Sequence, residues 1–109
     1  NHATALFHGN GQITRVTEDV GRHNAMDKLV GHCLQDNLLP LAQHGILVSG
    51  RASFELMQKT LAARCPLLVA IGAPSSLAVE LAQEYNLTLV GFLNRNRCNI
   101  YNGGFRLTE

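Results

Sequence analysis

Four short segments of the chain combine basic, hydroxyl and glycine residues in a way that suits an anionic ligand. They are residues 18–23, 49–53, 72–76 and 93–97, and they carry Arg22, Arg51, Arg95 and Arg97. Guanidinium groups bind phosphate through paired hydrogen bonds, and glycines let the backbone approach a ligand closely. Each arginine taken alone could be an ordinary solvated loop charge. The four together predict a site for phosphate or pyrophosphate.

One side chain in these segments could exchange a proton near neutral pH, namely His23. It could act as a general acid or base beside Asp19, but a histidine at the start of a helix is as often a structural hydrogen-bonding group. We favour the structural interpretation and predict no catalytic residue.

The three cysteines, Cys33, Cys65 and Cys98, lie far apart and form no Cys-x-x-Cys pair. Such spacing is typical of a reducing compartment, so we expect three free thiols and a cytoplasmic location. Cys33 and Cys65 suit core packing. Cys98 follows the arginine segment but is better explained as a small residue that starts an edge strand.

Composition limits the classes of function. The charged fraction is 16% and the formal net charge is +1, which argues against a general nucleic-acid binder. No apolar run approaches the roughly 20 residues needed to cross a bilayer, so we expect no membrane contact. A chain of 109 residues with 46% hydrophobic content can bury one core, which predicts a single domain over residues 1–109. Because it opens on Asn1 without a Met, we expect it to be part of a longer protein.

The first elements that must position these segments are a hairpin and a helix. Asn10-Gly11 lies between two strand-like runs, residues 3–8 and 12–18, which predicts an antiparallel pair. Apolar residues then recur at helical spacing from Met26 to Leu38. Asn24 is the expected N-cap of this helix, with Asp27 three residues later, and we expect the helix to stop before Pro40.

Three short apolar runs follow, residues 46–48, 67–71 and 87–92, and they are too continuous to be half-exposed strands. Amphipathic helical patterns with opening serines separate them, at residues 54–61 and 77–85. Two strand-helix-strand units predict a three-layer α/β/α sandwich with a mixed five-stranded sheet, to which residues 98–101 could add a short strand. The four segments then share the sheet edge where helix N-termini lie.

Residues 18–29, Glu-Asp-Val-Gly-Arg-His-Asn-Ala-Met-Asp-Lys-Leu, resemble the signature of the formate dehydrogenase accessory sulfurtransferase family, often called FdhD. Residues 49–55, 78–82 and 86–92 match the family in the expected order, so the resemblance covers essentially the whole chain. Its members are similar in fold to cytidine deaminases, and the resemblance implies that fold here.

The resemblance also implies a function. Family members carry sulfur from a cysteine desulfurase to the bis(molybdopterin guanine dinucleotide) molybdenum cofactor before its insertion into formate dehydrogenase. The anionic groups would then be the cofactor's pyrophosphates, and we expect a homodimer. The family's cofactor-binding stretch corresponds here to six residues, of which Phe92 and Arg97 match the usual pattern. The full set of expected cofactor-binding residues is Phe92, Leu93, Asn94, Arg95, Asn96, Arg97, Asp19, Arg22, His23, Ser49, Arg51 and Ser53.

One family feature has no counterpart here. The persulfide cysteine of the family lies in a Cys-x-x-Cys segment upstream of the stretch that precedes His2, so we expect this chain to be the C-terminal, cofactor-binding part and not to transfer sulfur itself. A nucleotide-binding or protein-interaction module without chemistry is the alternative. A zinc deaminase is less favoured, because its zinc-ligand patterns are missing, and we expect no zinc or other metal.

Overall fold

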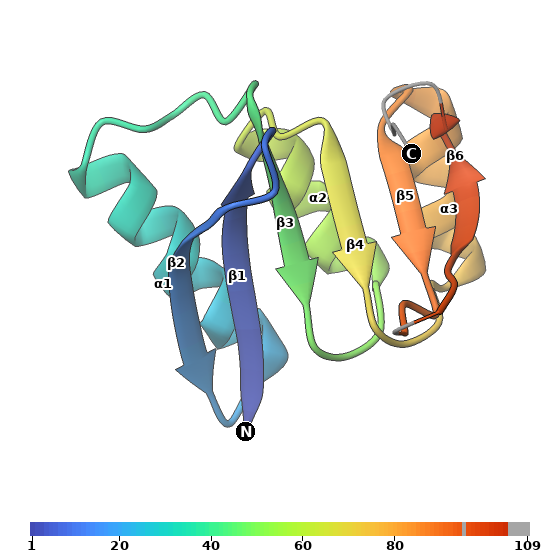
Figure 1. Cartoon of the computed structure of the whole chain (residues 1–109), viewed down its shortest axis with the longest axis horizontal. Helices are drawn as coiled ribbons and strands as arrows, with labels where there is room; N and C mark the ends of the chain where they lie inside the picture. Colours follow the sequence, from blue (N-terminus) through green and yellow to red (C-terminus); the bar gives the residue numbers. More distant parts are fainter. Residues whose placement is uncertain (95, 105–109) are drawn as a thin grey trace.

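The computed structural model describes residues 1–94 and 96–104, in which a six-stranded sheet has the order β2-β1-β3-β4-β5-β6 (Figure 1). β1 (His2–His8) and β2 (Ile13–Asp19) form the predicted hairpin. Gly11 has a φ of +88° in its turn, a conformation that glycine adopts without a steric penalty. β1 also pairs with β3 in antiparallel orientation, so it lies inside the sheet and β2 forms one edge.

The parallel part of the sheet consists of β3 (His44–Val48), β4 (Leu67–Ala70) and β5 (Thr88–Gly91). β6 (Asn99–Asn102) pairs with β5 in antiparallel orientation and forms the second edge. The expectation of five strands was therefore wrong. The polar stretch after β5 returns along the sheet and adds the sixth strand, which the sequence indicated only as a possibility.

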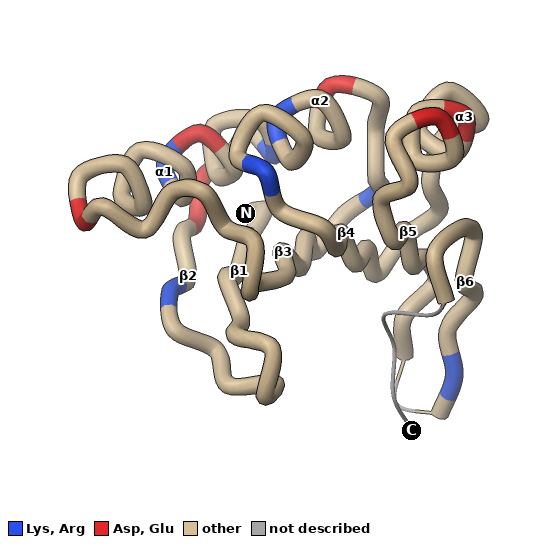
Figure 2. The backbone as a smooth tube through the Cα atoms, turned by 90° about the horizontal axis from the view of Figure 1, so that it is seen from above, with Lys and Arg blue, Asp and Glu red and all other residues tan. Residues whose placement is uncertain are grey.

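The three helices lie together on one face of the sheet, as Figure 2 shows from above. They are α1 (Arg22–Gln35), α2 (Phe54–Ala62) and α3 (Ser76–Glu84). The expected three-layer sandwich is not what these residues form, since they make two layers. From β3 the strands advance in one direction, to β4 and then β5. Right-handed crossovers that advance in one direction put their helices on the same face. The likeness to cytidine deaminases stays a prediction.

The register of the sheet separates a covered face from an open one. Leu6, Ile46, Leu68 and Leu89 are register neighbours, are fully buried, and belong to the same core cluster as helix residues such as Met26 and Leu56. The adjacent row across the sheet is also apolar and faces away from the helices. Its members are Val16, Ala5, Leu47, Val69, Val90 and Ile100.

The first helix starts earlier and ends earlier than its pattern predicted. Its N-cap is Gly21, not Asn24, and no side chain caps it. Asp19, the last residue of β2, accepts a hydrogen bond from the Gly21 N–H at 3.1 Å. This bond holds the turn that precedes the helix. At the other end the helix stops at Gln35 because Asn37 has a φ of +58°, which a helix cannot continue.

All three helices end in the same way. The residues after their C-caps, Asn37, Arg64 and Asn86, have φ values of +58°, +56° and +54°. In each case the next residue donates its N–H to a carbonyl of the last helical turn, as Leu38 does to Cys33 at 2.8 Å. This is the Schellman arrangement, which satisfies helix carbonyls that would otherwise lack partners. It directs Leu38 and its counterparts Cys65 and Leu87 back towards the core.

Within the described residues, the longest helix has 14 residues, and none combines the length and the apolar character that crossing a bilayer requires.

Candidate functional site

The loops that follow β2, β3, β4 and β5 all lie at one edge of the sheet, as predicted (Figure 1). Backbone hydrogen bonds connect three of them. Gly72 donates to the Gly50 carbonyl at 2.9 Å, and Phe92 donates to the Gly72 carbonyl at 3.1 Å. There is little space above Gly72, where a Cβ would lie 3.1 Å from Cγ of Arg51. The loops therefore form a continuous surface from β3 to β5.

A cavity of about 540 Å³ opens at the β4 and β5 end of this surface. It is lined by Ile71, Phe92, Leu93, Asn94, Arg97 and Asn99. Four of these six residues come from the stretch expected to bind the cofactor. Of the other two residues of that stretch, Asn96 is exposed and is not among the lining residues, and residue 95 lies outside the described residues.

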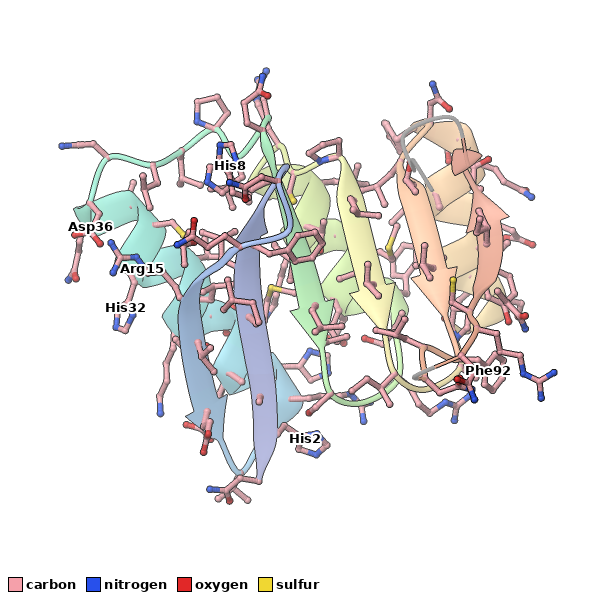
Figure 3. The ribbon with its side chains drawn as sticks, viewed as in Figure 1. His2, His8, Arg15, His32, Asp36 and Phe92 are labelled. Carbon is pink, nitrogen blue, oxygen red and sulfur yellow. The ribbon has the colours of Figure 1, made fainter. Side chains whose placement is uncertain are left out.

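Phe92 is the most unusual of these residues, and it is labelled in Figure 3. Its φ is +52° and its side chain is 48% exposed, although it is large and apolar. A non-glycine residue in the left-handed region is strained. At Asn37, Arg64 and Asn86 this conformation ends a helix, whereas Phe92 follows β5 and its exposed ring lines the cavity.

The rest of the loop is organised by one side chain. Asn94 Oδ1 accepts hydrogen bonds from the N–H groups of Asn96, at 2.8 Å, and Arg97, at 3.0 Å, and its own N–H donates to the Arg97 carbonyl. This is an Asx turn, in which asparagine shapes its own loop. Asn94 therefore positions Arg97, and its side-chain oxygen is already in use.

The arginines of the surface are free to bind an anion. Arg22, Arg51 and Arg97 are exposed, and their guanidinium groups form no hydrogen bond or ion pair with the described part of the chain. The N-termini of α1 and α2 lie at the same edge and add unpaired backbone N–H groups. Three of the four predicted arginines are therefore exposed and unpaired within the described residues, and the fourth, residue 95, lies outside them.

Two serines of the expected set have structural roles. Ser49 Oγ accepts from the Ala3 N–H at 2.9 Å, which ties β1 to the loop after β3. Ser53 Oγ accepts from the Leu56 N–H at 3.2 Å and caps α2 as its position predicted. A contact of either hydroxyl with a ligand stays a prediction.

Asp19 is also engaged within the protein. Its carboxylate contacts Nζ of Lys28 at 2.8 Å, and it accepts from the Gly21 N–H. The hydrogen bond from Lys28, followed by that from Gly21, lowers the pKa of Asp19 to about 2. A carboxylate that stays ionised and paired in this way suits the positioning of the turn before Arg22 better than direct contact with a phosphate.

His23 is not paired with Asp19, the partner that sequence proximity suggested. Its Nδ1 lies 3.5 Å from Oε2 of Glu55, at the start of α2. Glu55 belongs to the motif at residues 49–55, which does not predict its contact with His23, and the sequence predicts no role for His2. The His2 ring lies against Gly50, where a Cβ would be 3.4 Å from His2 Nδ1. The pairing of β1 with β2 could have indicated that His2 lies near the site, because it places His2 opposite Asp19.

The three thiols remain unpaired, as predicted, and only Cys98 is exposed. Burial raises the pKa of Cys33, and burial raises that of Cys65 to about 11. Cys65 also lies 3.2 Å from the His44 carbonyl oxygen. Cys33 and Cys65 are therefore unreactive packing residues. No group of three or more potential metal ligands occurs in the part of the chain that the structure describes.

Comparison with known proteins gives a consistent picture. The family model described as "FdhD/NarQ family" matches residues 1–108. The sulfur carrier protein FdhD of Streptomyces coelicolor is 58% identical over 106 residues, which are 97% of this chain and 38% of that protein. The protein of the same name from Saccharolobus solfataricus is 45% identical over 97% of this chain and 41% of its own length.

A solved structure agrees with these relatives. The crystal structure of a candidate formate dehydrogenase accessory protein from Desulfotalea psychrophila matches with a TM-score of 0.90 and 31% identity, over 98% of this chain and 47% of that one. The chain thus spans about two fifths of the length of the curated relatives. Its placement in the C-terminal part stays a prediction. By family model, sequence and structure, the chain belongs to the FdhD/NarQ family.

Proposed function

We propose that this chain is the part of a sulfur carrier protein that binds the guanine nucleotide portion of the bis(molybdopterin guanine dinucleotide) molybdenum cofactor. The cavity of about 540 Å³ beside Phe92 and Arg97 is the observation that supports this most directly. The cavity offers both groups with which a protein binds a nucleotide. An exposed aromatic ring can stack on the base, and an unpaired guanidinium can bind the phosphates.

The wider edge of the sheet supports a large ligand. The surface continues from the cavity through Gly72 to Arg51 and the start of α2. A dinucleotide cofactor carries pyrophosphate groups at a distance from its base, and helix N-termini together with arginines bind such groups. The charge and the extent of this edge therefore fit the cofactor better than they fit a small monoanion.

The partners follow from the same proposal. A cysteine desulfurase would supply the sulfur, and formate dehydrogenase would receive the sulfurated cofactor. The relatives named as sulfur carriers support the transfer of sulfur, and the accessory protein of similar structure supports formate dehydrogenase as the recipient. We further propose that the protein acts as a homodimer.

A binding module without chemistry is the second candidate, and the thiols favour it for these 109 residues taken alone. Cys33 and Cys65 are buried, and burial raises the pKa of both, so neither is a ready nucleophile. Cys98 is exposed but has no second cysteine nearby in sequence to resolve a persulfide. We therefore propose that the sulfur-bearing group belongs to another part of a longer protein and that the present chain contributes cofactor binding.

Titration with guanosine diphosphate, followed by the backbone amide signals of the chain, tests the site. We expect shifts in the loops after β3, β4 and β5. Arg97→Ala should weaken binding by about 1.5 to 3 kcal/mol, the usual cost of a lost charge-assisted hydrogen bond. Arg64→Ala is the matched control, because it removes the same charge at the other end of α2. Equal affinities for the two variants, or no shifts in the loops, would contradict the proposal.

A further inference from the structure

Two cavities adjoin at the end of α2, at the edge of the sheet opposite the loops of the proposed nucleotide site (Figure 1). One has a volume of about 560 Å³ and lies between α2 and α3, with Leu61 and Tyr85 among its lining residues. The other has a volume of about 410 Å³ and lies between the end of α2 and the loop that precedes β3, where Pro40 lines it. Ala62 and Arg64 line both cavities, so the two form one groove, the α2-end groove.

The wall of this groove on α3 continues as an apolar stripe. Leu77, Leu81 and Tyr85 follow one another at intervals of one helical turn, which places them on one side of the helix. Leu77 is 56% exposed and Tyr85 is 59% exposed, whereas Leu81 packs partly against the core. A row of large, exposed, apolar side chains is typical of a surface that another protein covers.

Arg64 stands between the two cavities in a conformation that destabilises the chain. Its φ is +56°, and the corresponding residues after α1 and α3 are Asn37 and Asn86, a residue type that adopts this conformation more readily than arginine does. The arginine side chain does not end the helix, because the backbone N–H groups of Arg64 and Cys65 bind the carbonyls of the last turn. The side chain is exposed, and no carboxylate of the described chain pairs with it. Its charge is therefore available to a partner.

Arg64 and Tyr85 line the same cavity and offer donors of complementary kinds. A guanidinium can donate two parallel hydrogen bonds to one carboxylate, and a phenol hydroxyl can donate a further one. Neither side chain forms a hydrogen bond with the part of the chain that the structure describes. Arginine and tyrosine are also among the residue types that contribute most binding energy at protein interfaces. The cavity thus combines a site for a carboxylate with apolar walls.

We propose that the α2-end groove docks an amphipathic helix of another protein, and that this helix carries an aspartate or glutamate beside its apolar face. The apolar side chains of the helix lie along the stripe on α3, and its carboxylate accepts hydrogen bonds from Arg64 and Tyr85. A helix fits because it presents side chains at the same one-turn spacing as the stripe. The unpaired guanidinium selects an acidic helix over a neutral or basic one. The inference is independent of the proposed function, because the groove and the nucleotide cavity share no lining residue.

A matched pair of synthetic helical peptides tests the groove. Both peptides carry leucines one helical turn apart. One has glutamates beside the leucines, and the other has glutamines at those positions. Calorimetry gives their affinities for the 109-residue chain, and the backbone amide signals of the chain locate the bound peptide. We expect shifts in α3 and at the end of α2, and about a tenfold higher affinity for the glutamate peptide, since its carboxylate gains charge-assisted hydrogen bonds.

Variants assign the effect to individual residues. Arg64→Ala should weaken the glutamate peptide about tenfold and leave the glutamine peptide unchanged, so the preference between the peptides disappears. A purely structural role of Arg64 would weaken both peptides equally. Arg51→Ala is the matched control, because it removes an exposed arginine at the opposite edge of the sheet and should bind both peptides as the wild type does.

The apolar wall is tested in the same way. Tyr85→Ala should weaken both peptides, because the ring contacts the apolar face of the helix as well as the carboxylate. Ile13→Ala is its control, because Ile13 is a similarly exposed apolar residue, 56% exposed, but lies in β2 at the far edge of the sheet.

Four outcomes would overturn the inference. The wild type could bind neither peptide, or bind both with equal affinity, which would exclude recognition of the carboxylate. Arg51→Ala could lose as much affinity as Arg64→Ala, which would indicate unspecific attraction between charges. The shifts could lie on the open face of the sheet and not in α3. Finally, sedimentation could show that the chain alone forms a dimer that Tyr85→Ala dissociates, and the groove would then be occupied by a second copy.

Discussion

Nζ of Lys28 lies 2.8 Å from Oδ2 of Asp19 and 3.0 Å from the carbonyl oxygen of Glu18. The ammonium group thus connects α1 to the last residues of β2 through one side-chain contact and one backbone contact. The Asp19 carboxylate also accepts from Gly21, the N-cap of that helix. One carboxylate and one ammonium therefore fix how the chain turns from strand to helix, immediately before Arg22 and His23.

Asp19→Asn should lower the melting temperature at neutral pH and have little effect in acid. Folding lowers the pKa of Asp19 from 3.8 to about 2. The ionised carboxylate therefore stabilises the folded state at pH values above the unfolded pKa, and this stabilisation is lost as the pH falls through about 2. Thermal unfolding of both proteins between pH 7 and pH 2 measures this. The two melting temperatures should converge below about pH 4. A difference in melting temperature that stays constant down to pH 2 would show that the charge of Asp19 does not contribute to stability.

Phe92→Gly should be more stable than Phe92→Ala, although glycine usually destabilises a chain. Both changes remove a half-exposed ring, but only alanine keeps a Cβ at a φ of +52°. The left-handed conformation costs a non-glycine residue about 1 kcal/mol or more, and we expect a difference of about that size in the free energy of unfolding. Urea denaturation measures it. An alanine variant at least as stable as the glycine variant would argue against backbone strain at this residue.

Arg64→Gly should raise the free energy of unfolding by about 0.5 to 1 kcal/mol. Arg64 follows the C-cap of α2 with a φ of +56°, and its side chain is exposed. Arg64→Ala provides the comparison, because it removes the same side chain and keeps the strained backbone. If both variants gained equally in denaturant unfolding, the gain would come from the lost charge and not from the backbone.

Cys98 should not carry sulfur, although it is the one exposed thiol among the described residues and precedes Asn99 of the cavity. It has no second cysteine nearby in sequence to resolve a persulfide. After incubation with a cysteine desulfurase and cysteine, mass spectrometry should find no added sulfur on this chain. A longer protein that includes the upstream cysteine segment should be loaded equally well with Cys98→Ser. Rapid loading of the 109-residue chain on Cys98 would contradict the proposed division of roles.

The sequence by itself determined the features that depend on neighbouring residues. Asn10-Gly11 specified the hairpin, and Ser53 capped its helix where the pattern placed it, because turns and caps are made within a few residues. The continuous apolar runs specified buried parallel strands and therefore the edge at which the loops meet. The signature at residues 18–29 specified the family, which the comparisons confirmed.

Only the tertiary structure decided which distant residues meet. His23 contacts Glu55, 32 residues further along the chain, and not its near neighbour Asp19, because α1 and α2 pack side by side on one face of the sheet. All helices lie on one face because of the spatial order of the strands in the sheet, and apolar periodicity does not encode that order. Periodicity reports how much of each element is buried, whereas the contacts between elements depend on the direction of every crossover at once.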